Sequence, residues 1–182
     1  MEPSILENFV ERACSAAACE NPTAALRSLL EESISDKTAM AEAIARQPDD
    51  EVLIFENETC SIWTCRYHSD VVLPPHEHLM TVHIAVYRGN EVEILYHRDA
   101  DRLRHAKNRV VLEGEVVSLG PDAVHAVTAE GDMPSYAIHI YEGATTQVTR
   151  SLFDWTSGGE IEFTMANFHA MLRKPTDVEE LQ

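Results

Sequence analysis

The stretch Leu73-Pro74-Pro75-His76-Glu77-His78 decides how this sequence is read, together with the later stretch Gly120-Pro121-Asp122-Ala123-Val124-His125. His76 and His78 follow two stiff prolines, and on an extended chain side chains two residues apart point to the same face. His125, arriving from a distant strand, can complete a trigonal set of nitrogen ligands. Three neutral nitrogens suit iron, zinc, copper or nickel better than calcium or magnesium. The sequence therefore predicts a transition-metal site, with a chance pairing of histidines as the alternative.

The composition restricts the partners that this chain can have. Its 182 residues are about one domain long, and they carry 31 acidic against 14 basic side chains, a net charge of −17. Such a chain is repelled by phosphate backbones and anionic lipid, so we expect neither nucleic-acid nor membrane partners. The N-terminus lacks the basic start and apolar run of a secretory signal. The four cysteines have no zinc-finger spacing and are expected to be free thiols, so we predict a cytoplasmic location.

The first 48 residues are predicted to form a helical cap. Ser4-Ile5-Leu6-Glu7 is a capping-box pattern, and Asn21-Pro22 offers an N-cap followed by proline at the first helical position. A third helix is expected from about Asp36 to Arg46. A last, short helix is expected from Met165 to Arg173, ahead of Pro175. The apolar faces of the first helices need another layer to cover them.

From Val52 the hydrophobic period changes to two, which is typical of strands. Turn signals separate short segments that are rich in β-branched and aromatic residues. The expected strands are Val52–Glu56, Cys60–Tyr67, Thr81–Tyr87, Glu91–His97, Arg109–Leu112, Val116–Leu119, Val124–Thr128, Tyr136–Tyr141 and Thr146–Phe153. Without crossover helices, these predict an all-β core, an antiparallel jelly roll. We expect a single domain over 1–182: the cap (1–48), a β-barrel (51–155) and a C-terminal tail with a short helix (156–182).

The motif around the histidines resembles that of the cupin superfamily, whose fold is the double-stranded β-helix. Its first motif is an H-x-H followed by an acidic residue, a strand and a glycine turn, which here is His76-Glu77-His78-Leu79-Met80-Thr81-Val82-His83 and later Gly89. Its second motif carries the third histidine, here in Pro121-Asp122-Ala123-Val124-His125, one residue shorter and without the inner glycine. His83 stands where typical cupins place an acidic ligand. It is predicted as a fourth metal ligand, with a cavity-lining role as the alternative.

A closer resemblance is to the bacterial branch of cysteine-dioxygenase-like proteins, which are thiol dioxygenases. It is carried by Gly114–Pro121 leading to His125, and by Ser135-Tyr136-Ala137-Ile138-His139-Ile140-Tyr141. In that family an H-x-Y pair stands beside a three-histidine iron. The resemblance implies that His139 and Tyr141 are catalytic partners of an iron(II) centre, facing the same cavity because they share strand parity. Orientation toward the outer helices is the alternative.

One departure from the thiol-dioxygenase pattern concerns the substrate. Those enzymes hold the carboxylate of the amino acid with an arginine on a strand before the H-x-H. The matching stretch here, Asp50-Glu51-Val52-Leu53-Ile54-Phe55, has no arginine. Apolar or acidic residues cannot replace a bidentate arginine contact, so free cysteine is a doubtful substrate. Arg66, Arg88, Arg98 and Arg150 are unranked candidates for binding an anion.

The resemblance therefore implies a non-haem iron(II) dioxygenase that uses dioxygen to oxidise a small molecule, with a thiol as the substrate class that the family suggests. Zinc, nickel or manganese are the alternative metals. The alternative functions are a non-oxidative metal cupin, such as an isomerase or hydrolase, and a small-molecule-binding cupin without catalysis. Exposed edge strands make a homodimer plausible.

Overall fold

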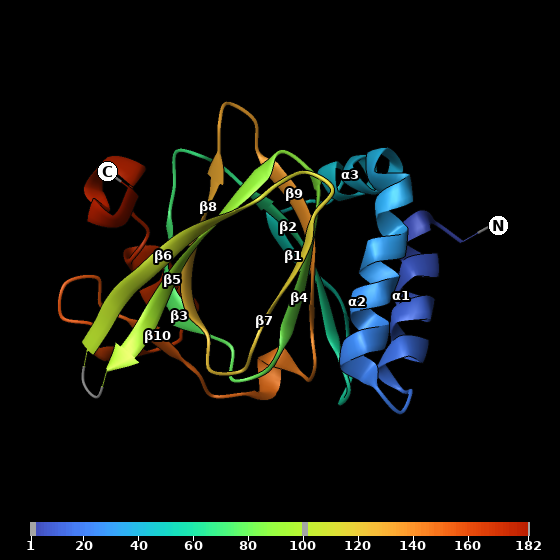
Figure 1. Cartoon of the computed structure of the whole chain (residues 1–182), viewed down its shortest axis with the longest axis horizontal. Helices are drawn as coiled ribbons and strands as arrows, with labels where there is room; N and C mark the ends of the chain where they lie inside the picture. The colour runs from blue at the N-terminus through green and yellow to red at the C-terminus, as the bar shows by residue number, and fades with distance from the viewer. Residues whose placement is uncertain (1–2, 100–101, 182) are drawn as a thin grey trace.

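The computed structural model describes residues 3–99 and 102–181 (Figure 1). Three helices come first: α1 (Ile5–Ala17), α2 (Pro22–Ser33) and α3 (Lys37–Ala45), with the short turn η1 (Ile34–Asp36) before α3. The predicted capping box of α1 is present, because Ser4 and Glu7 each accept the backbone amide of the other, at 3.2 and 2.6 Å. Asn21 caps α2 by accepting from the amide of Ala24, as predicted.

The β-strands form two antiparallel sheets. The five-stranded sheet has the order β1 (Glu51–Glu56), β2 (Ser61–Tyr67), β9 (Ser135–Tyr141), β4 (Val82–Arg88) and β7 (Val116–Leu119). The six-stranded sheet has the order β11 (Glu160–Glu162), β10 (Ser151–Phe153), β3 (Leu73–Glu77), β8 (Val124–Glu130), β5 (Asn90–Asp99) and β6 (Arg102–Val111). The remaining elements are η2 (Thr145–Gln147), α4 (Met165–Ala170), η3 (Pro175–Asp177) and η4 (Glu179–Leu181).

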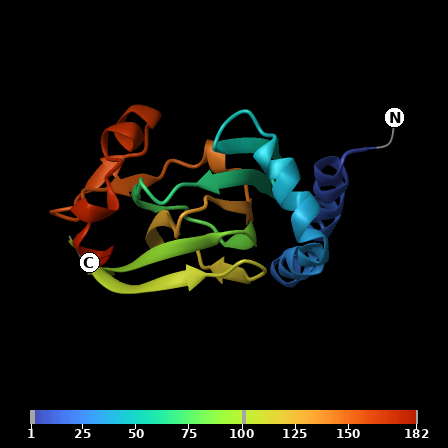
Figure 2. The ribbon, with the colours of Figure 1, turned by 90° about the horizontal axis from the view of Figure 1, so that it is seen from above.

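This architecture confirms the predicted fold class: a double-stranded β-helix, or jelly roll, with an N-terminal helical cap and a short C-terminal helix. Helices α1 to α3 lie on the outer side of the five-stranded sheet, and the C-terminal segment lies at the opposite end of the molecule (Figures 1 and 2). Among the described residues, no helix combines the length and apolar character that crossing a bilayer requires.

Strand alternation divides the side chains between two layers. On β9, Ile138 and Ile140 pack against the helical cap, whereas Ala137 and Tyr141 belong to the cluster between the sheets. Successive side chains of a strand point to opposite faces, so one strand serves both layers. The outer layer is mainly apolar and holds the cap in place, whereas the space between the sheets holds several polar groups.

Four strands differ from the sequence-based expectation. β3 and β11 were not among the expected strands, and β6 begins at Arg102 instead of Arg109. Proline has no N–H for a strand ladder, so β3 lacks an ordinary strand pattern. Most of β6 is exposed, so its composition shows no apolar alternation. The expected strand Thr146–Phe153 forms only at β10, after the turn η2.

Leu26 tests how strongly the cap is held. Its side chain is fully buried between α2 and the five-stranded sheet, so Leu26→Ala is expected to lower the free energy of unfolding by about 2–5 kcal/mol. Leu112→Ala is the matched control, because Leu112 is 49% exposed and should change stability by about 0.5 kcal/mol or less. Denaturant unfolding measures both, and equal effects would contradict the packing described above.

Candidate metal centre

The pairing of β3 with β8 brings two of the predicted ligands side by side. His76 lies directly opposite His125, and their ring centroids are 4.5 Å apart. His78 follows at the end of β3, with its ring 4.7 Å from His76 and 5.1 Å from His125. One ring nitrogen from each of the three lies within 4.8 Å of the others. The structure therefore brings together the three imidazoles that the sequence singled out.

A β-bulge produces this convergence. Leu73 pairs with Val127 and His76 pairs with His125, so three steps along β3 match two along β8. The extra residue falls at Pro74 and Pro75, which cannot donate to a regular ladder. Without the bulge, Leu73 and His76 would face opposite sides of the sheet, and with it both face the space between the sheets.

The three rings fit a transition-metal ion. The Nε2 atoms of His78 and His125 are 2.9 Å apart, which is close to the spacing of two nitrogens bound at right angles to one ion by bonds of about 2.1 Å. All three rings are buried. Burial, and the neighbouring imidazoles, lower the pKa of His76 and of His78 well below the ordinary value, so both are neutral and have a free lone pair.

Partners behind the rings orient two of them for binding. His76 Nδ1 donates to the carbonyl of Pro74 at 2.9 Å. His125 Nδ1 donates to the carboxylate of Glu93, which is fully buried. Burial raises the pKa of Glu93, but His125 more than offsets this and the pKa lies below its ordinary value. Glu93 is therefore an anion that fixes His125 with Nε2 toward the other rings.

A cavity of about 130 Å³ opens beside the triad. His139 and Tyr141, predicted to face the same cavity, both line it. The other lining residues besides the triad are Glu51, Trp63, Cys65, Tyr67, Leu73, Val127, Thr145, Arg150, Phe163, Met165 and Phe168. This wall is largely apolar, with a few polar groups on it, as expected of a small-molecule site.

His139 and Tyr141 are held beside the triad by a second buried acid. His139 Nε2 lies 3.2 Å from the carboxylate of Glu91, and its Nδ1 lies 3.5 Å from the hydroxyl of Tyr141. The Tyr141 ring is 4.7 Å from the ring of His78. Burial opposes charge on His139, but Cys65, Glu91 and Tyr141 outweigh it and raise the pKa of His139 well above its ordinary value.

His83 does not join the triad, which corrects the prediction of a fourth ligand. Its Nδ1 bonds to the Ser118 hydroxyl and its Nε2 to the Glu142 carboxylate, both at 2.8 Å, so neither nitrogen is free for an ion. The alternative, a cavity-lining role, is also wrong. On β4, Val82 and Ile84 face the space between the sheets, so His83 lies on the helix side with Ala85.

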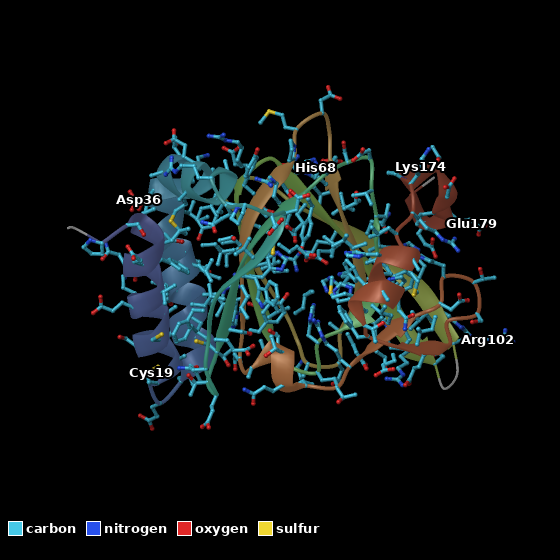
Figure 3. All side chains as sticks on the ribbon, turned by 180° about the vertical axis from the view of Figure 1, so that it is seen from behind. Cys19, Asp36, His68, Arg102, Lys174 and Glu179 are labelled. Carbon is cyan, nitrogen blue, oxygen red and sulfur yellow. The ribbon has the colours of Figure 1, made fainter. Side chains whose placement is uncertain are left out.

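The other histidines lie outside the cavity, as expected from their scatter in the sequence. His68 sits at one end of the barrel (Figure 3), and its ring bonds to Asp50 at 3.3 Å. His105 bonds to Asn108, and both His97 and His169 are exposed. Glu77, which stands between two triad residues, turns away from them toward Arg98 and the backbone of Ser151.

Sequence analysis missed Glu91 and Glu93 and left Arg150 unranked. The signal for the two acids was present: in Glu91-Val92-Glu93-Ile94 the acids alternate with apolar residues. Val92 and Ile94 pack on the outer side of the six-stranded sheet, so the acids point between the sheets. Nothing in the sequence ranks Arg150, because its place in the cavity wall depends on the segment before the short strand β10.

Comparison with known proteins establishes the fold. No family model matches the sequence, and no curated protein matches it. A solved structure from Bacillus halodurans superposes with a TM-score of 0.50 and 12% identity, covering 57% of this chain and 76% of that one. With the arrangement of the two sheets, this decides the fold. It is the double-stranded β-helix.

Two further solved structures show weaker likeness to this chain. A Klebsiella pneumoniae protein with a double-stranded β-helix domain has a TM-score of 0.45 and 14% identity, over 63% of this chain and 94% of that one. A hydroquinone 1,2-dioxygenase from a Sphingomonas species has a TM-score of 0.46 and 16% identity, over 57% and 72%. Identities this low leave the reaction open.

The three-ligand arrangement predicts that two histidine variants differ in whether they bind metal. His76→Ala should abolish tight binding of one ferrous ion per chain, because the trigonal set loses a ligand. His83→Ala should keep that ion while lowering the free energy of unfolding by roughly 1–3 kcal/mol, because Ser118 and Glu142 lose a buried partner. Metal analysis after anaerobic loading, with denaturant unfolding alongside, measures both. Loss of the ion in both variants would contradict the three-ligand arrangement.

Glu93 offers a second prediction, with Glu91 as its matched control. Glu93→Gln should weaken metal binding about 10- to 100-fold, because the anion that orients His125 is lost. Glu91→Gln removes an equally buried acid that contacts His139 and no triad ring, so its effect on metal affinity should be several-fold smaller. Competition against a chelator of known affinity measures the two constants. Equal losses would show that buried charge in general, and not the contact with His125, supports the ion.

Proposed function

We propose that this chain is a metal-dependent enzyme that holds ferrous iron with His76, His78 and His125 and oxidises a small molecule with dioxygen. The observation that carries the proposal is the convergence of three buried imidazoles beside a cavity of small-molecule size. A three-nitrogen neutral set suits ferrous iron and leaves coordination positions for other ligands. The resemblance to thiol dioxygenases makes a thiol the first substrate class to test.

When bound, ferrous iron supplies redox chemistry and open positions at which substrate and dioxygen meet. The protein supplies position and polarity. The Tyr141 ring lies 4.7 Å from the ring of His78 and lines the cavity. Its role in this proposal is to donate a hydrogen bond from its hydroxyl to an oxygen atom of the bound substrate. His139 orients that hydroxyl and is itself fixed by Glu91. Apolar side chains such as Trp63 and Phe168 limit the water that enters the cavity.

Arg150 supports an anionic group on the substrate. Its guanidinium lines the cavity, lies 3.9 Å above the ring of Phe163, and contacts His78. Burial lowers its pKa, yet an arginine this basic keeps its charge. Among the described residues, no carboxylate forms an ion pair with Arg150. Glu51 lines the same cavity and burial raises the pKa of its carboxyl, so a cation in this largely apolar space favours an acidic ligand. In this proposal Arg150, which precedes β10, therefore takes the anion-binding role of the arginine that is absent from residues 50–55.

Oxygen uptake tests the reaction and the anionic group together. Protein loaded anaerobically with ferrous iron should consume dioxygen when a small mercapto acid is added, and His76→Ala should not. Arg150→Gln should lower kcat/KM for the mercapto acid by roughly 10- to 100-fold, since a charged hydrogen-bond pair is lost. The matching alkyl thiol, which has no carboxylate, should be almost insensitive to that substitution.

Two results would contradict this proposal in different ways. Iron binding without thiol-dependent uptake would favour a non-oxidative metal enzyme or a binding module, the latter recognised by ligand-induced thermal stabilisation without turnover. Uptake that is equally affected by Arg150→Gln for both thiols would keep the reaction and remove the anion-binding role.

A further inference from the structure

We infer that metal binding and anion binding in the cavity are coupled through His78. A metal ion can bind that ring only when the hydrogen bond from Arg150 to His78 Nδ1 is broken. The inference rests on the proposed metal site and adds a regulation of that site. It follows from assigning a proton to each hydrogen bond along the chain of contacts Arg150–His78–His125–Glu93.

The two ends of this chain fix the direction of every bond in it. Arg150 can only donate, so His78 Nδ1, 2.9 Å from its Nη1, must accept. At the other end a carboxyl oxygen of Glu93 accepts from His125 Nδ1, which leaves His125 Nε2 to accept. A neutral imidazole carries one ring proton. His78 therefore has its proton on Nε2, and donates it to Nε2 of His125 at 2.9 Å.

This assignment separates His78 from the other two rings. His76 and His125 carry the ring proton on Nδ1, where Pro74 and Glu93 accept it, so each already presents a bare Nε2. His78 presents a protonated Nε2 at the same place. Before an ion can bind there, the proton of His78 must move from Nε2 to Nδ1. No net proton is gained or lost in this exchange of tautomers.

The exchange acts directly on Arg150. With a proton on Nδ1, His78 would face the guanidinium donor to donor at 2.9 Å, which is repulsive, so Arg150 must turn away. Its stacking on Phe163 keeps it in the cavity wall. Glu51, Tyr67 and Tyr141 line the same cavity. The freed N–H groups then face these residues across the cavity, and an anionic ligand is a stronger acceptor for them than a neutral hydroxyl or a carboxyl whose pKa burial raises.

Linkage makes the coupling reciprocal. An anion that holds Arg150 away from His78 favours the tautomer that binds the ion, so a carboxylate should raise metal affinity, and the metal should raise carboxylate affinity by the same factor. In the absence of an anion, Arg150 opposes the ion. Removing its guanidinium should therefore tighten metal binding.

The tautomers can be observed directly in the wild-type chain. Long-range ¹H–¹⁵N correlation spectra of the histidine rings in the metal-free protein should show the proton of His78 on Nε2, and those of His76 and His125 on Nδ1. With zinc, which is diamagnetic and redox-inert, all three should carry the proton on Nδ1. A metal-free His78 with its proton on Nδ1 overturns the inference, and this measurement needs no variant.

Zinc titrations with and without propionate then measure the coupling. Propionate should raise the zinc affinity of the wild-type chain at least about fivefold. Arg150→Met should bind zinc at least about fivefold more tightly than wild type without propionate, and should lose the response to propionate. Arg150→Gln repeats the test if Arg150→Met does not fold. Persistence of the response without the guanidinium would show that propionate binds the metal itself, and would overturn the coupling.

Failure of this inference is distinguishable from failure of the proposed function. A wild-type chain that binds no zinc sensitive to His76→Ala removes the metal site and, with it, the coupling. A chain that binds zinc at the triad without any effect of propionate or of Arg150 keeps the metal site and removes only the coupling.

Discussion

The bulged pairing of β3 with β8 is the constraint on which the site depends. It sets His76 opposite His125, and the prolines at the bulge turn both Leu73 and His76 toward the space between the sheets. A one-residue change of register would send His76 to the outer face, where it could meet neither His125 nor His78. The metal centre is thus a consequence of strand register, and the rest of the barrel serves to hold that register.

The free-energy cost of burying polar groups between the sheets must be offset by apolar burial elsewhere in the molecule. Glu91, Glu93, His125 and His139 are buried between the sheets, where an unpaired charge or hydrogen-bonding group is costly. Each of these acids is paired with an imidazole. The compensating burial comes from the other face of the same strands, where Ile62, Ile138 and Ile140 pack against the helical cap. The cap therefore stabilises a barrel that has several buried polar contacts in its interior.

The sequence predicted those parts of the site that follow from the alternation of side chains along a strand. It failed where this alternation was not considered or where the sequence does not show it. His139 and Tyr141 alternate with Ile138 and Ile140, so their inward direction could be predicted from β9 alone. The same rule, applied to Val82 and Ile84, would have rejected His83 as a ligand. Glu91 and Glu93 were overlooked because acids in a strand usually face water. The position of Arg150 depends on how the segment before β10 crosses the barrel, which no local pattern encodes. The predicted range for β6 was too short for a related reason, because a strand that is largely exposed shows no apolar alternation.

The hydrogen-bond chain through the triad also explains how the site can persist before an ion arrives. Three converging imidazoles without a metal would leave lone pairs facing one another, which is unfavourable in a buried space. Placing one ring proton on Nε2 of His78 converts that repulsion into a donor–acceptor contact with His125, and Arg150 satisfies the nitrogen left on the other side. Both ring nitrogens of His78 therefore have a hydrogen-bond partner without a metal. An ion must replace two good hydrogen bonds, so its net affinity is lower than three imidazoles alone would give. The same arrangement that keeps the empty barrel folded also makes the arrival of an anion beside Arg150 favourable to loading the metal.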